Sequence, residues 1–137
     1  MNKTALILGA SSGMGLASAK KLSKEGFNLL LVYRARRAET AFAEEQFERF
    51  REGGATVKSF NADALKADVV ANLISQFSAS GLKIDLVLHS IARGNLKPMF
   101  DGPSTLSEQD FELTIQAMGT SYYGWCKALF ESHLLAD

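Results

Sequence analysis

Three glycines lie close together near the start of the chain, in the segment Gly9-Ala-Ser-Ser-Gly-Met-Gly15. The segment follows an apolar run and precedes helical spacing, where glycines let backbone N–H groups approach a phosphate at a helix N-terminus. It therefore predicts a site for the pyrophosphate of a dinucleotide. No Lys-Ser or Lys-Thr pair directly follows the last glycine, which excludes a Walker-type loop. The alternative is that the glycines only allow close packing of the helix on the strand.

A basic cluster of Arg34, Arg36 and Arg37 follows the second apolar run. Arg34 stands about 20 residues beyond the glycines, where an NAD-binding fold carries an Asp or Glu for the ribose 2′-hydroxyl. Here no acid occurs between Glu25 and Glu39, and guanidinium groups suit a 2′-phosphate by charge and geometry. The cluster favours NADP over NAD. The alternative is a solvated, basic start to the next helix.

A tyrosine and a lysine four residues apart occur late in the chain, at Tyr123 and Lys127. This i,i+4 spacing places both on one face of a helix, which makes them a candidate catalytic pair. The competing interpretation is that this aromatic stretch packs against the sheet or another subunit.

The elements that position these residues alternate between strand and helix. Strands are predicted at 4–8, 27–33, 55–60 and 84–89, and helices at 13–25, 38–52, 65–80 and 107–134. Segment 90–105 holds both prolines and is predicted to be a functional loop. The alternation predicts an α/β fold with a doubly wound parallel sheet of strand order 3-2-1-4.

The last helix is predicted to begin with a capping box of Ser107 and Asp110. Its apolar residues are expected to form one seam: Phe111, Ile115, Met118, Tyr122, Trp125 and Leu129, widened by Ala117, Cys126 and Phe130. A helix that is apolar on two sides needs two partners. We therefore expect a homo-oligomer that forms through the 107–134 helix.

Composition sets the broad class. With 137 residues the chain is predicted to be a single domain over 1–137. Fifteen basic residues balance fifteen acidic ones, which argues against nucleic acid or an anionic membrane as partner. There is one cysteine and no Cys/His cluster, so neither a disulfide nor a metal site is expected. No apolar run has the length of a membrane span, and a cytoplasmic location is predicted.

Three motifs in the correct order resemble those of the short-chain dehydrogenase/reductase family. The glycine segment resembles the family's Gly-x-x-x-Gly-x-Gly, and Asn61-Ala-Asp63-Ala64 resembles its adenine-binding segment. Asp85-Leu-Val-Leu-His-Ser-Ile-Ala92 falls where the family carries Asn-Asn-Ala-Gly. His89-Ser90-Ile91 and the following Arg93-Gly-Asn-Leu-Lys-Pro98 are similar to NADPH-dependent enoyl-acyl-carrier-protein reductases.

The resemblance implies a Rossmann-like fold and an NAD(P)H-dependent oxidoreductase that reduces an enoyl or keto acyl thioester. His89 is expected to be structural, and Arg93 to face either solvent or a substrate. The implied cofactor-binding residues are Gly9, Ser11, Ser12, Gly13, Met14, Gly15, Arg34, Arg37, Asp63, Ala64, Ser90, Ile91 and Ala92.

The similarity covers only the first half of a typical family member, whose catalytic Tyr and Lys lie beyond a fifth strand. The fold is therefore expected to be truncated before that strand, and the chain alone to be inactive. In this register Tyr123 and Lys127 fall on the preceding helix and are the less favoured catalytic candidates. Met118 occupies the position of a catalytic Asn in many dehydrogenases, which favours the enoyl branch. The alternatives are an inactive dinucleotide-binding module and an interaction protein with an idle nucleotide loop.

Overall fold

The structure is a computed structural model that describes residues 3–137; Met1 and Asn2 of the predicted domain lie outside the described residues. Its strands are β1 (Thr4–Leu8), β2 (Asn28–Tyr33), β3 (Val57–Asn61) and β4 (Leu86–His89). Its helices are α1 (Gly13–Lys24), α2 (Arg37–Glu52), α3 (Ala67–Ala79), α4 (Glu108–Ile115), the π-helix η1 (Gln116–Thr120) and α5 (Ser121–Glu131). All strand pairs are parallel and the order is β3-β2-β1-β4, which confirms the predicted topology.

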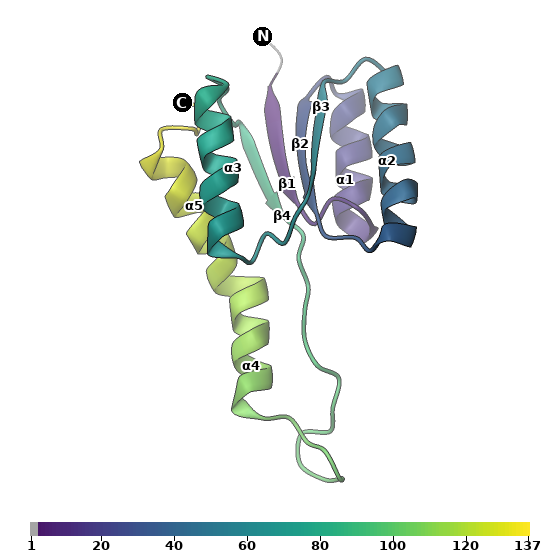
Figure 1. Cartoon of the computed structure of the whole chain (residues 1–137), viewed down its shortest axis with the longest axis vertical. Helices are drawn as coiled ribbons and strands as arrows, with labels where there is room; N and C mark the ends of the chain where they lie inside the picture. Colours follow the sequence, from purple (N-terminus) through teal and green to yellow (C-terminus); the bar gives the residue numbers. More distant parts are fainter. Residues whose placement is uncertain (1–2) are drawn as a thin grey trace.

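Both faces of the sheet are covered (Figure 1). Side chains alternate along a strand, so neighbouring residues serve opposite faces. On β1, Leu6 and Leu8 belong to a core with α3 and α5, whereas Ala5 and Ile7 belong to a core with α1 and α2. Two apolar cores of this kind explain why the strands carry continuous apolar runs.

The sheet continues beyond β4 by one bridge. Ile84 pairs in parallel with Leu135: the Ile84 N–H donates to Leu134 O at 2.7 Å, and the Ala136 N–H donates to Ile84 O at 2.9 Å. Among the described residues this single bridge is the only pairing beyond β4 and no fifth strand is formed, in agreement with the predicted truncation.

The prediction of one regular helix over 107–134 is wrong in two respects. The helix ends at Glu131, and the five-residue π-helix η1 interrupts it. A π turn holds one residue more than an α turn, so it moves the buried face of the helix by one position. Periodicity at 3.6 residues per turn cannot reveal such an insertion.

The predicted apolar seam consequently divides between two faces. Trp125 and Leu129 are buried, as is Ala117 in η1. Of the rest, Cys126 is partly buried, and five residues are at least 46 % exposed: Phe111, Ile115, Met118, Tyr122 and Phe130. The predicted capping box is present, since the Ser107 side chain accepts from the Asp110 N–H and the Asp110 carboxylate accepts from the Ser107 N–H.

Trp125 connects α5 to the loop that follows β3. Its indole is 1 % exposed, and Nε1 donates to the Ala64 carbonyl oxygen at 2.9 Å. Trp125→Phe leaves that carbonyl without its donor and leaves a void, so we expect a loss of about 2 kcal/mol in the free energy of unfolding. Urea denaturation measures this loss. Tyr123→Phe on the same helix is the control, because Tyr123 is 67 % exposed, and its midpoint should stay close to that of the wild type.

No helix within residues 3–137 combines the length and the apolar character that crossing a membrane requires.

Candidate functional site

Two of the three motif glycines allow the backbone of β1, α1 and β4 to meet. Gly9 has φ of +89°, and a Cβ added there would lie 2.1 Å from the Ser90 carbonyl oxygen. A Cβ on Gly15 would lie 2.0 Å from the Gly9 carbonyl oxygen. Atoms that are not bonded to each other do not approach so closely. A side chain at either position would therefore collide with the backbone, and both positions require glycine. Close packing of the helix on the strand is therefore one role of Gly9 and Gly15.

Gly13 is different, because packing does not explain it. Nothing among the described residues lies within 4 Å of a Cβ built there, and its φ is +54°. It begins α1, whose first turn carries no acid, and the Ser12 side chain makes no capping hydrogen bond with the described residues. The first turn of α1 thus presents free space, exposed backbone and the positive end of a helix dipole. These are the properties that a phosphate-binding turn needs.

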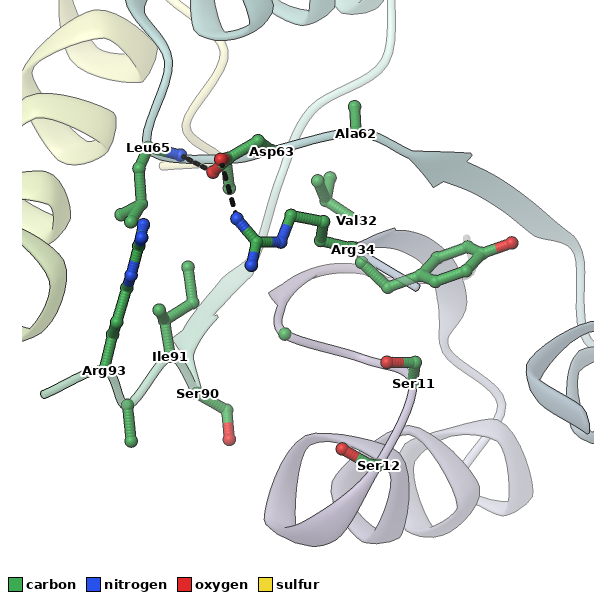
Figure 2. Close-up of a pocket in the computed structure, with 14 residues that line it drawn as sticks. Ser11, Ser12, Val32, Arg34, Ala62, Asp63, Leu65, Ser90, Ile91 and Arg93 are labelled. Carbon is green, nitrogen blue, oxygen red and sulfur yellow. Dashed lines mark hydrogen bonds and ion pairs between the residues drawn. The ribbon is translucent and has the colours of Figure 1, made fainter. Parts of the chain in front are cut away.

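A cavity of about 260 Å³ opens beside this turn, at the carboxyl ends of the strands (Figure 2). In open α/β sheets ligands bind at this edge, where the connections from neighbouring strands diverge to opposite faces. Here that divergence falls between β1 and β4. The residues that line the cavity are Gly9, Ser11, Ser12, Val32, Tyr33, Arg34, Ala62, Asp63, Ala64, Leu65, Ser90, Ile91, Ala92 and Arg93.

The cavity brings together most of the cofactor residues named from the sequence. Four of them do not line it: Gly13, Met14, Gly15 and Arg37. Met14 is 81 % exposed, and Gly15 lies buried beneath the turn. Arg37 is the exposed first residue of α2. Sequence reasoning missed four lining residues that end β2 or follow β3, namely Val32, Tyr33, Ala62 and Leu65. The rule that ligands bind at the carboxyl ends of parallel strands could have found them.

Arg34 and Asp63 form an ion pair across one wall of the cavity (Figure 2). The Arg34 guanidinium donates to Asp63 Oδ2 at 3.2 Å, and Asp63 Oδ1 accepts from the Leu65 N–H at 3.0 Å. The Arg34 side chain is 64 % exposed, so the pair is solvated and weakly stabilising. The guanidinium can therefore exchange Asp63 for another anion at little cost.

Tyr33 lines the cavity, but its hydroxyl is committed elsewhere. It donates to Glu44 Oε1 on α2 at 2.7 Å, and Glu44 also accepts from the Ser59 hydroxyl at 2.9 Å. Burial, followed by the hydrogen bond to Glu44, raises the pKa of Tyr33 to about 12. Tyr33 therefore remains a neutral donor that holds α2 against the sheet.

His89, at the end of β4, contacts α5 and does not line the cavity. Its Nε2 lies 2.7 Å from the Ser121 hydroxyl, and its ring meets Tyr122 edge to face at 5.7 Å. Burial lowers the pKa of His89 below its ordinary value, which favours the neutral imidazole. The next residue, Ser90, donates its N–H to the Leu8 carbonyl oxygen at 2.7 Å and directs the chain along the cavity wall.

Tyr123 and Lys127 lie on α5 outside the cavity. Tyr123 is largely exposed, and Lys127 forms a surface ion pair with Glu131 at 3.7 Å. The structure does not bring this pair to the residues that line the cavity.

Asp110 fixes the long loop between β4 and α4. It is 6 % exposed and accepts from the Ser107 N–H at 2.8 Å, from Lys97 Nζ at 3.1 Å and from the Asn95 side chain. The Ser107 amide, then Asn95 and Lys97, hold the pKa of Asp110 well below its usual range. The sequence predicted the cap at Ser107. It did not predict the contacts of Asp110 with Asn95 and Lys97, because these join the loop to α4 across more than ten residues of sequence.

Comparison with known proteins agrees with this geometry. The model of a family described as Enoyl-(Acyl carrier protein) reductase matches residues 9–136. The 7alpha-hydroxysteroid dehydrogenase of Paraclostridium sordellii is 30 % identical over 122 residues, which are 88 % of this chain and 44 % of that protein. The fatty acyl-CoA reductase of Acinetobacter baylyi is 32 % identical over 122 residues, which are 89 % of this chain and 38 % of that protein. The chain thus spans less than half the length of these curated relatives.

Solved structures share the fold. A protein from Burkholderia cenocepacia that was solved with bound NADP superposes with a TM-score of 0.78 at 24 % identity, over 95 % of this chain and 48 % of that one. The sheet order and the glycine turn define a Rossmann-like fold. The chain belongs to the short-chain dehydrogenase/reductase family.

Proposed function

We propose that the chain is a single dinucleotide-binding domain and that the cavity at the carboxyl ends of its strands takes NADP(H). The observation that carries the proposal is the open first turn of α1 at Gly13, with the cavity and the Arg34 guanidinium beside it. Backbone N–H groups suit a pyrophosphate, and the exposed arginine suits a second, separate phosphate. The donor set thus fits a dinucleotide that carries a 2′-phosphate better than one without it.

In this proposal the residues in and beside the cavity each bind one part of the dinucleotide. Gly9 and residues 11–15 hold the pyrophosphate, and Arg34 exchanges Asp63 for the 2′-phosphate with help from Arg37 at the start of α2. Asp63 and Ala64 border the adenine. Ser90, Ile91 and Ala92 line the ribose and nicotinamide. When bound, NADPH supplies the hydride for a reduction.

We further propose that the chain is the amino-terminal half of an NADP-dependent oxidoreductase that reduces an enoyl or keto acyl thioester. The name of the matching family supports this substrate class. So does the name of a relative in Staphylococcus epidermidis, a 3-oxoacyl-(acyl-carrier-protein) reductase that is 30 % identical over 98 residues. Because Tyr123 and Lys127 lie outside the cavity, these 137 residues alone should bind the dinucleotide without turnover.

The exposed face of α4, η1 and α5 supports a second copy of the chain as partner. These helices carry four apolar side chains that are 49 to 72 % exposed: Phe111, Ile115, Met118 and Phe130. Exposed apolar patches of this kind mark interaction surfaces. The proposed assembly is a homo-oligomer.

Calorimetric titration with NADPH tests the proposed function, followed by an assay with a crotonyl thioester. We expect saturable binding of NADPH, weaker binding of NADH, and no oxidation of NADPH by this chain. Absence of NADPH binding would contradict the proposal. Turnover by the chain alone would return the catalytic role to Tyr123 and Lys127, and Tyr123→Phe would then abolish it.

A further inference from the structure

One side chain holds the main chain that carries the three arginines. Asn61, the last residue of β3, faces the turn between β2 and α2. Its Oδ1 accepts from the Ala35 N–H at 3.1 Å, and its Nδ2 donates to the Ala35 carbonyl oxygen at 3.2 Å. Ala35 lies directly between Arg34 and the pair Arg36 and Arg37. The carboxamide thus binds both polar groups of the central residue of the basic segment.

These two hydrogen bonds continue the sheet where its main-chain pairing ends. The register of β2 and β3 ends at Tyr33 opposite Asn61, and one more main-chain bond runs from the Ala62 N–H to the Tyr33 carbonyl oxygen at 2.8 Å. Beyond that point the main-chain pairing of β2 with β3 ends. Because a carboxamide carries one donor group and one acceptor, it can replace the missing peptide of a neighbouring strand.

The same carboxamide also reaches the first turn of α2. Asn61 Nδ2 lies 3.3 Å from the Thr40 hydroxyl, which donates to the Arg36 carbonyl oxygen at 3.0 Å. Two residues after Asn61, the Asp63 carboxylate pairs with Arg34. The end of β3 therefore holds the basic segment on both sides of Ala35.

We propose that Asn61 is a positioning residue that fixes the Arg34–Arg37 segment for recognition of the 2′-phosphate, an inference that rests on the proposed binding of NADP(H). Arginine side chains on an unfixed loop lose more conformational freedom when they order on a ligand. With Ala35 held, the main chain beneath the guanidinium groups is already in place. Asn61 then acts on selectivity between NADP and NAD without touching the dinucleotide.

Two nucleotides that differ by one phosphate isolate this effect. Adenosine 2′,5′-bisphosphate and adenosine 5′-monophosphate are titrated calorimetrically into the whole chain. In Asn61→Ala we expect binding of the bisphosphate to weaken about tenfold, from the loss of two neutral hydrogen bonds, and that of the monophosphate to change less than about twofold. Asn61→Asp keeps the size and the acceptor but loses the donor and adds a negative charge, so its loss should be at least as large.

Asn72→Ala is the matched control, an exposed asparagine on α3 that bonds only Gln76 within its own helix among the described residues. It should leave both affinities unchanged. The inference is overturned if the ratio of the two affinities in Asn61→Ala equals that of the wild type, including the case in which both fall together. If the wild type selects the bisphosphate, the proposed function stands whichever way Asn61 behaves. If the wild type binds neither nucleotide, the proposed function fails and the role of Asn61 fails with it.

Discussion

Gly15→Ala is expected to lower the free energy of unfolding by about 3 kcal/mol or more, a large share of the stability of a small domain. The added Cβ would lie 2.0 Å from the Gly9 carbonyl oxygen, 2.9 Å from the Gly9 carbonyl carbon and 3.3 Å from Ser90 Cβ. Two of these atoms are backbone and cannot rotate away. Either α1 shifts away from the sheet or the turn after β1 opens. Urea denaturation followed by circular dichroism measures the loss.

Two other glycines separate this steric effect from the properties of alanine itself. Gly124 lies inside α5 with nothing described within 4 Å of its Cβ position, so Gly124→Ala should stabilise the chain by about 0.5–1 kcal/mol through helix propensity. Gly13→Ala meets open space at φ of +54° and should cost about 1–2 kcal/mol from the left-handed backbone alone. A Gly15→Ala protein with the wild-type midpoint would show that α1 does not pack this closely against the turn.

Arg34→Ala is expected to weaken binding of NADPH roughly 10- to 100-fold, because each hydrogen bond to a charged group contributes about 1.5–3 kcal/mol. Binding of NADH should change little, since NADH lacks the 2′-phosphate. Stability should also change little, because the Arg34 side chain is 64 % exposed and its ion pair with Asp63 is solvated. Calorimetric titration of both dinucleotides gives the two affinities.

Arg49→Ala is the control for a general loss of positive charge. Arg49 is an exposed residue of α2 that, like Arg34, pairs with an acid (Glu45, at 2.6 Å), but it does not line the cavity. It should leave both affinities unchanged. If Arg34→Ala weakens NADPH and NADH equally, Arg34 does not recognise the 2′-phosphate.

The sequence was sufficient for the sheet order, and it predicts a candidate site at the edge where the structure has a cavity. Alternating apolar runs and helices determine a parallel order, and the residues at the carboxyl ends of the strands must then converge. The sequence could not show that Gly9 and Gly15 are needed for packing whereas Gly13 is not. That difference depends on how closely Ser90 approaches Gly9 and how closely Gly9 approaches Gly15. Sequence reasoning also missed the π turn at 116–120, which changes which side chains of the last helix are buried.

Long-range polar contacts were the other part that sequence reasoning could not predict. Arg34 was identified by its place after β2, but its pairing with Asp63 joins residues on two different loops. Asn61 begins the segment that resembles the family's adenine-binding segment, yet nothing in that segment indicates that the Asn61 carboxamide binds Ala35. Such contacts depend on the register between β2 and β3, which the apolar pattern of either strand does not specify.

The hydrogen bond from Trp125 to Ala64 gives the chain an internal optical probe. Trp125 is the only tryptophan in the sequence, so all indole emission comes from one buried position. Its Nε1 is bonded to the carbonyl of a residue that forms the cavity wall. A ligand that displaces this wall alters the polarity around the indole, and reduced nicotinamide can accept its excitation energy. Binding of a ligand in the cavity can therefore be followed by the intrinsic fluorescence of Trp125, without any added label.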